Sequence, residues 1–204
     1  MTDFSRSTLR PRVPVLWAFF AYAFAARVLP YVLHETAGAP LRNAVAAYPW
    51  NFSPLFALAI FGGAAFSWRF AALAPLATFV IGDLLIAAVA GGEWGFYRDQ
   101  AFTYLGFLVI VACGVSLRTR RDAARIALAG LGGSTAFFIV SNFGVWITGG
   151  GRSHPLTPSG LLMCFVDAIP FFAPTVLSMA IFLPLLFSPL AVRSEVKALE
   201  ETAA

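Results

Sequence analysis

The sequence predicts an all-α membrane protein: a bundle of six transmembrane helices with both termini in the cytoplasm. Hydrophobic residues make up 59% of its 204 positions and charged residues only 12%, whereas soluble domains carry about 25% charged residues. Apolar residues gather into runs of about 17 to 28, the length needed to cross ~30 Å of hydrocarbon. Arginines concentrate in alternate connections between these runs, as expected for cytoplasmic loops.

The first predicted span covers residues 13–33 and is interrupted by Arg27. Residues 1–12 before it are polar and basic, and we assign them to a cytoplasmic N-terminal segment. The apolar stretch at residues 13–26 also fits a cleaved signal peptide. However, the apolar pattern resumes after Arg27 and is rich in bulky aromatic residues, which favours a retained span.

Five further apolar runs follow, at residues 52–68, 70–90, 101–117, 126–148 and 159–187. Pro54 suits the first turn of a helix, where its missing N–H leaves no bond unmade. Pro170, Pro174 and Pro184 should kink the last run, which is either one long span or a re-entrant turn followed by a span. The predicted transmembrane domain is residues 13–190, and residues 191–204 form a charged cytoplasmic tail.

The basic residues indicate the orientation. Ten of the 14 lie at the termini and in the even-numbered loops, three lie in the other loops, and Arg27 lies inside a span. Cytoplasmic loops carry the excess of Lys and Arg. We therefore expect both termini on the cytoplasmic side of the bacterial inner membrane. The net charge of +4 follows from these topology signals and does not indicate a nucleic-acid partner.

Polar residues inside the spans are the candidates for function, because each is costly in hydrocarbon. Arg27, Asp83, Asn142 and Asp167 come from four different spans, and each is expected roughly 7–12 Å below the outer edge of the bilayer. Together they predict an outward-facing pocket with polar groups at its floor, and Phe138 and Trp146 would supply aromatic walls. The outer loops offer residues that could cover it: His34, Glu35, Arg42, Asn51, Trp94, Arg98, Asp99, Arg152 and His154.

The predicted substrate-binding residues are Arg27, Asn51, Asp83, Asn142, Trp146 and Asp167. An alternative is a purely structural arrangement, in which Arg27 pairs with Asp83 while Asp167 hydrogen-bonds Asn142. Two acids and one arginine would then leave one carboxylate without an opposite charge, which favours a site.

Several chemistries are not indicated. The sequence holds no Walker A motif, no Gly-x-Ser-x-Gly and no His-Glu-x-x-His, so we predict no ATP hydrolysis, no catalytic residue and no cofactor. His34, His154 and Cys164 are conceivable metal ligands, but distant loop histidines are more often surface residues, and we predict no metal site. Cys113 and Cys164 fall near opposite membrane faces, which argues against a disulfide.

Five blocks of sequence resemble an uncharacterised family of small bacterial multi-pass membrane proteins. The blocks are Arg27-Val-Leu-Pro30, Asn51-Phe-Ser-Pro54 with Phe61-Gly-Gly63, Leu73-Ala-Pro75 with Gly82-Asp83, Ser141-Asn-Phe-Gly-Val-Trp146, and Ala168-Ile-Pro-Phe-Phe172. This resemblance covers about residues 27–187 and implies no established activity.

More distantly, the chain is similar to the S components of energy-coupling-factor transporters. That resemblance implies six spans, a pocket for a vitamin or metal, and partner subunits with ATPases. The sequence thus predicts a substrate-binding membrane protein of a small-molecule uptake system, in contact with lipid and an unknown ligand. The alternatives are a structural or assembly protein without a ligand and, with less support, an enzyme using Asp83 or Asp167 as acid or base.

Overall fold

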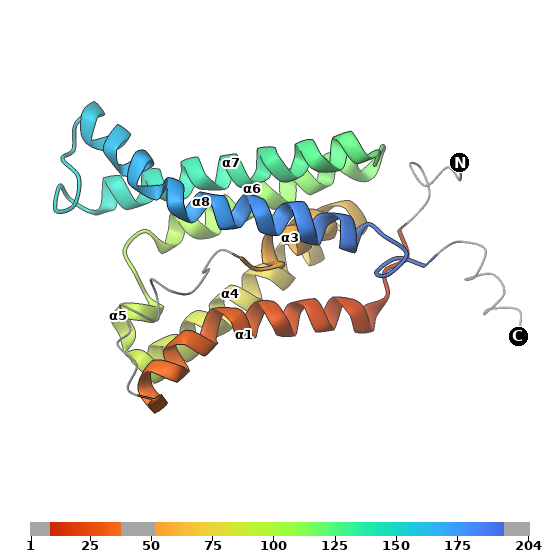
Figure 1. Cartoon of the computed structure of the whole chain (residues 1–204), viewed down its shortest axis with the longest axis horizontal. Coiled ribbons are helices and arrows are strands. Elements are labelled where there is room, and N and C mark those ends of the chain that lie inside the picture. Colours follow the sequence, from red (N-terminus) through yellow and green to blue (C-terminus); the bar gives the residue numbers. More distant parts are fainter. Residues whose placement is uncertain (1–8, 38–51, 194–204) are drawn as a thin grey trace, which may run out of the picture.

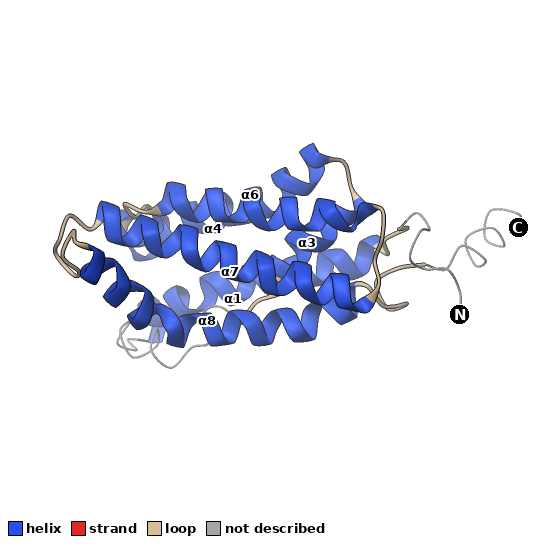
Figure 2. Ribbon diagram, turned by 90° about the horizontal axis from the view of Figure 1, so that it is seen from above, coloured by secondary structure: helices blue, strands red, loops and turns tan. Residues whose placement is uncertain are grey.

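The computed structural model describes residues 9–37 and 52–193, which form helices joined by short loops (Figures 1 and 2). No strand is present in these two stretches beyond an isolated bridge between Pro11 and Val192. The elements are α1 (Val13–Ala37), α3 (Leu55–Ala65), α4 (Trp68–Ala90), α5 (Gly92–Gly95), α6 (Gln100–Val115), the 3₁₀ turn η1 (Ser116–Arg118), α7 (Ala123–Thr148) and α8 (Pro158–Leu186).

In the described part of the chain, five segments are long and apolar enough to cross a membrane. They contain α1, α4, α6, α7 and α8, and the α6 segment also includes α5 and η1. Each leaves large hydrophobic side chains exposed on its outer surface, among them Trp17 on α1, Leu73 on α4 and Leu162 on α8. In a bilayer these side chains face lipid. The chain is therefore an all-helical, multi-pass membrane protein, as predicted.

The structure differs from the predicted second span, which was a full crossing at residues 52–68. Its helix, α3, has 11 residues, which makes it about 17 Å long at 1.5 Å per residue. That length is short of the ~30 Å of a bilayer core. Nearly all of its residues are buried, and it packs against α1, α4, α6, α7 and α8. A helix that is apolar on all sides belongs in the centre of a bundle.

Two glycines let α3 and α6 touch through their backbones. A Cβ atom at Gly63 would overlap the backbone of Val111, and one at Gly114 would overlap the backbone of Ile60. Small residues allow this kind of close approach between membrane helices. The contact fixes α3 in the middle of the bundle.

Both ends of the described chain lie at one end of the bundle, at the right of Figure 1, and we call this the terminal end. The Arg12 N–H donates to the Ala191 carbonyl at 2.7 Å, and the Arg193 N–H donates to the Arg10 carbonyl at 2.9 Å. Arg118 also lies there and donates to the carbonyls of Gly63 and Phe66, which satisfies the end of α3. The opposite end, called the loop end, carries α5 and the turn between α7 and α8.

The last predicted span is one continuous helix, α8, of 29 residues. Figure 1 shows that its first half bends away from the axis of its second half. Pro170 and Pro174 lie in this region, and a proline removes a helical hydrogen bond and kinks the helix. Most of the predicted terminal segments lies outside the described residues.

Candidate functional site

The most buried polar group within the spans is the carboxylate of Asp83 on α4, which is 0% exposed. It forms an ion pair with the guanidinium of Arg27 on α1. Its second oxygen accepts hydrogen bonds from Gln100 Nε2 at 2.7 Å and from the Tyr104 hydroxyl at 2.8 Å, both on α6. Three donors from two helices thus compensate for burying the charge.

Glycines in α4 and around it make this cluster possible. A Cβ at Gly82 would lie 3.1 Å from Arg27 Cδ, so a larger residue would push the arginine aside. Gly91 ends α4 with φ of 102°, a backbone conformation that other residues rarely adopt. The chain then turns back through α5, where the Gly95 carbonyl accepts a hydrogen bond from Gln100 Nε2 at 3.0 Å.

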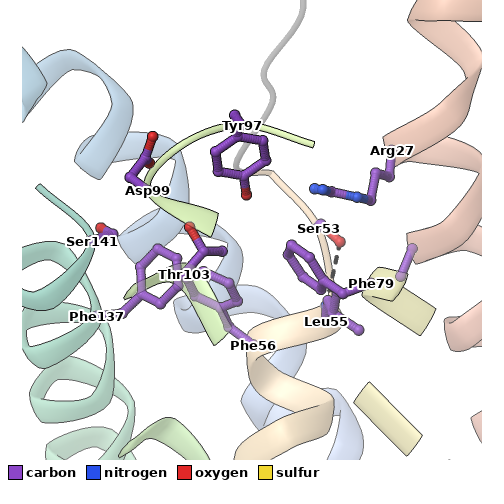
Figure 3. A pocket seen from close by; sticks show the side chains of 11 residues that line it. Arg27, Ser53, Leu55, Phe56, Phe79, Tyr97, Asp99, Thr103, Phe137 and Ser141 are labelled. Carbon is purple, nitrogen blue, oxygen red and sulfur yellow. Dashed lines mark hydrogen bonds between the residues drawn. The ribbon is translucent and has the colours of Figure 1, made fainter. Parts of the chain in front are cut away.

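A cavity of about 260 Å³, the central cavity, lies beside this cluster (Figure 3). Its lining comes from α1, α3, α4, α6 and α7. An aromatic group forms part of its wall: Phe56 packs against Phe137 with ring centroids 4.4 Å apart, and Phe79 lies on the other side. The polar residues that line it are Arg27, Ser53, Tyr97, Asp99, Thr103 and Ser141.

The N-terminus of α3 opens into this cavity. Ser53, Leu55 and Phe56 line it, and the first helical N–H, that of Leu55, donates to the Ser53 hydroxyl at 3.3 Å (Figure 3). The first N–H groups of a helix have no partner within the helix, and they carry the positive end of its dipole. Here the first residues of the helix lie in the wall of a cavity inside the bundle. Membrane transporters use broken or short helices in this way to receive ligands.

Asp99 brings a negative charge to the opposite side of the central cavity, where Figure 3 shows it across from Arg27 with Tyr97 between them. Its carboxylate forms no ion pair with any described residue. The guanidinium of Arg27 is already paired with Asp83 and lies 4.0 Å above the Phe79 ring. The cavity therefore offers one uncompensated carboxylate and one helix N-terminus.

The other predicted site residues lie elsewhere. Asp167 is exposed, and its carboxylate lies 3.0 Å from His154 Nε2, with which it interacts. Trp146 Nε1 donates to the Pro155 carbonyl at 2.9 Å, and Asn142 Nδ2 donates to the Phe138 carbonyl at 2.8 Å. The Asp167 and Trp146 contacts hold the turn between α7 and α8, whereas the Asn142 bond lies within α7. Asn51 lies outside the described residues.

The expectation that four polar residues converge is therefore only partly met. Arg27 and Asp83 come together, as considered in the structural alternative. Asn142 and Asp167 do not bond each other and do not line the central cavity. Depth along a span follows from the count of residues, whereas the direction of a side chain depends on the rotation of its helix.

The model of a protein family of unknown function, DUF6580, matches residues 7–200. The chain belongs to this family. No curated protein and no solved structure is similar enough to count as a match.

Sequence reasoning missed part of the site in this DUF6580 protein. The sequence prediction does not include Gln100 and Tyr104, which share one face of α6 at a spacing of four residues and bond each other at 2.9 Å. It includes Asp99 only as a covering residue. Among the described residues of this family member, no three His, Cys, Asp or Glu side chains gather as they would around a metal ion.

Proposed function

We propose that this protein is a substrate-binding membrane protein of a small-molecule uptake system and that the central cavity is its binding site. The observation that carries the proposal is the meeting of a buried helix N-terminus with an uncompensated carboxylate in one cavity. Small-molecule sites typically combine apolar and aromatic walls with a few convergent polar groups. The Phe56, Phe79 and Phe137 rings supply such walls.

The chemistry of the lining favours an organic ligand with two kinds of polar group. An anionic or acceptor group suits the α3 N-terminus, and a cationic or donor group suits Asp99. The aromatic rings would also favour a cationic group. The described lining offers one carboxylate and no His or Cys, which is a poor set of ligands for a metal ion.

The distribution of Lys and Arg supports an orientation with the terminal end in the cytoplasm. The pairing of the two ends of the described chain at that end supports placing both termini on one side. The central cavity then belongs to the outward half of an inner-membrane protein. By analogy with S components, the helical bundle would bind the ligand, and partner subunits with ATPases would drive its release.

A structural role without a ligand is the second candidate. It is favoured by the Asp83 cluster, in which the carboxylate has Arg27, Gln100 and Tyr104 as partners and needs nothing further. An enzyme using Asp83 as acid or base has less support, because that carboxylate is sealed from the cavity.

The test is mass spectrometry of the full chain, purified in mild detergent from cells grown in rich medium. Native spectra should show a protein population heavier by one small organic molecule, and the denatured protein should return to the mass of the chain. The released molecule should carry both an acceptor or anionic group and a donor or cationic group. A protein that remains unliganded after incubation with a cell extract of small metabolites would favour the structural role.

A further inference from the structure

The central cavity is the first of three cavities that follow one another along α7. It shares Phe137 and Ser141 with a second cavity of about 140 Å³ between α7 and α8, called the seam cavity. The seam cavity shares Ser134 with a third cavity of about 560 Å³, called the terminal cavity. The terminal cavity reaches Arg121 and Phe187, near the terminal end.

The three residues that join these cavities and Gly130, which lines the terminal cavity, form one stripe on α7. Gly130, Ser134, Phe137 and Ser141 are spaced by four, three and four residues, so they share one helix face. Three of the four are small. The exception is Phe137, which stands where the central and seam cavities meet, and its ring packs against Phe56 and Phe107.

Ser134 places an unpaired polar group on this stripe. It lies near the middle of α7, its residue is 1% exposed, and its hydroxyl has no hydrogen-bond partner among the described residues. Buried hydroxyls are normally paired with protein or water. Ser134 lines both the seam and the terminal cavity, so this unpaired hydroxyl belongs to the residue at which the two cavities meet.

The facing wall, on α8, is built in a way that allows movement. Thr175 is buried there and lines the seam cavity. Pro170 and Pro174 lie within the preceding five residues, in the region where Figure 1 shows α8 to bend. Prolines within membrane helices free backbone carbonyls, which is tolerated where the backbone lines a cavity. A proline-bent helix can widen the seam by changing its bend, without breaking the bundle.

We infer that the α7–α8 seam is a passage, gated by Phe137, through which a small polar molecule moves between the central cavity and the terminal end. This inference rests on the proposed function, because the central cavity is taken as the loop-end opening of the passage. It goes further by placing the route through the membrane inside this chain. Partner subunits would then supply energy without having to supply the path.

The test uses cysteine labelling of the full chain in membrane vesicles. In a background with Cys113→Ala and Cys164→Ala, single variants Ser141→Cys, Ser134→Cys and Thr135→Cys are treated with a small sulfonate-bearing methanethiosulfonate that does not cross lipid. Thr135 is the matched control, since it adjoins Ser134 but is exposed on the outer surface of α7. Right-side-out and inside-out vesicles are treated separately.

A passage predicts that Ser134→Cys reacts from both sides, about tenfold or more faster than Thr135→Cys, because a thiol in wet surroundings reacts and one in apolar surroundings is inert. Adding Phe137→Ala should accelerate labelling of Ser134→Cys from the loop-end side several-fold, about threefold or more. The same change should leave Thr135→Cys unaffected.

Two results would overturn the passage and separate it from the proposed function. If Ser141→Cys reacts while Ser134→Cys is as inert as Thr135→Cys, the central cavity is a closed binding site, and the passage is wrong while the proposed function stands. If Ser141→Cys is also inert from both sides, the central cavity is sealed, and both proposals fail.

Discussion

Arg27 and Asp83 are 56 positions apart in the sequence, and their charged groups form an ion pair inside the bundle. The pair ties α1 to α4 at the edge of the central cavity. The charge of Asp83 is fully compensated, because its other oxygen accepts hydrogen bonds from Gln100 and Tyr104. The pair is thus a structural support for the cavity, whose uncompensated acid is Asp99.

Replacing Asp83 by Asn should destabilise the protein strongly. The change leaves the Arg27 guanidinium without its counter-charge, and breaking a buried pair from one side costs about 3–5 kcal/mol. Thermal unfolding in detergent measures the effect as a lower Tm. The double variant Arg27→Met with Asp83→Leu should recover part of the loss, since it removes both charges. An unchanged Tm for Asp83→Asn would show that the pair contributes nothing.

Replacing Tyr104 by Phe removes one hydrogen bond to the same carboxylate and the bond that the hydroxyl accepts from Gln100. A bond to a charged group contributes about 1.5–3 kcal/mol, so the loss of stability should be smaller than that of Asp83→Asn. Tyr22→Phe is the control, because Tyr22 is exposed on α1. The account of the cluster is wrong if both tyrosine variants unfold at the same temperature.

Gly114→Ala should destabilise the bundle by separating α3 from α6. The added Cβ would overlap the backbone of Ile60, and overpacking of this kind costs about 1–3 kcal/mol. Gly132→Ala on α7 is the matched control, since its Cβ would have no neighbour within 4 Å. Alanine is preferred over glycine in a helix by about 0.5–1 kcal/mol, so that variant should be neutral or slightly more stable. Equal Tm values would argue against the close contact.

Asp167→Asn should leave ligand binding unchanged, although the sequence predicts Asp167 as a binding residue. Its side chain is 69% exposed and contacts His154, and it does not line the central cavity. The readout is the fraction of protein that retains the bound small molecule in native spectra. A large loss of that molecule would instead indicate that the binding site lies at the α7–α8 turn.

The sequence predicts the fold well where the signal is length and hydropathy. Long apolar runs predict α1, α4, α6, α7 and α8 because a bilayer of fixed thickness demands them. The same reasoning fails for α3, because an apolar run of 11 helical residues in the bundle centre looks like a span when its neighbours are also apolar. Its burial depends on Gly63 and Gly114 meeting across two helices, which no local pattern shows.

The site was harder to predict, for a related reason. Arg27 and Asp83 could be paired because each is costly alone in hydrocarbon. Gln100, Tyr104 and Asp99 lie at a helix start, where polar residues are ordinary, so nothing in the sequence distinguishes them. Their role comes from the turn through Gly91 and α5, which brings the start of α6 beside Asp83 and the central cavity.

The most direct test of the central claim compares Asp99→Asn with Glu93→Gln. Both changes neutralise an acid at the loop end, but Asp99 lines the central cavity, whereas Glu93 is exposed on α5. The measurement is the fraction of full-length protein that carries its co-purified small molecule in native mass spectra. If the central cavity is the binding site, Asp99→Asn should lose most of that molecule and Glu93→Gln should retain it. Equal retention by the two variants would contradict the assignment.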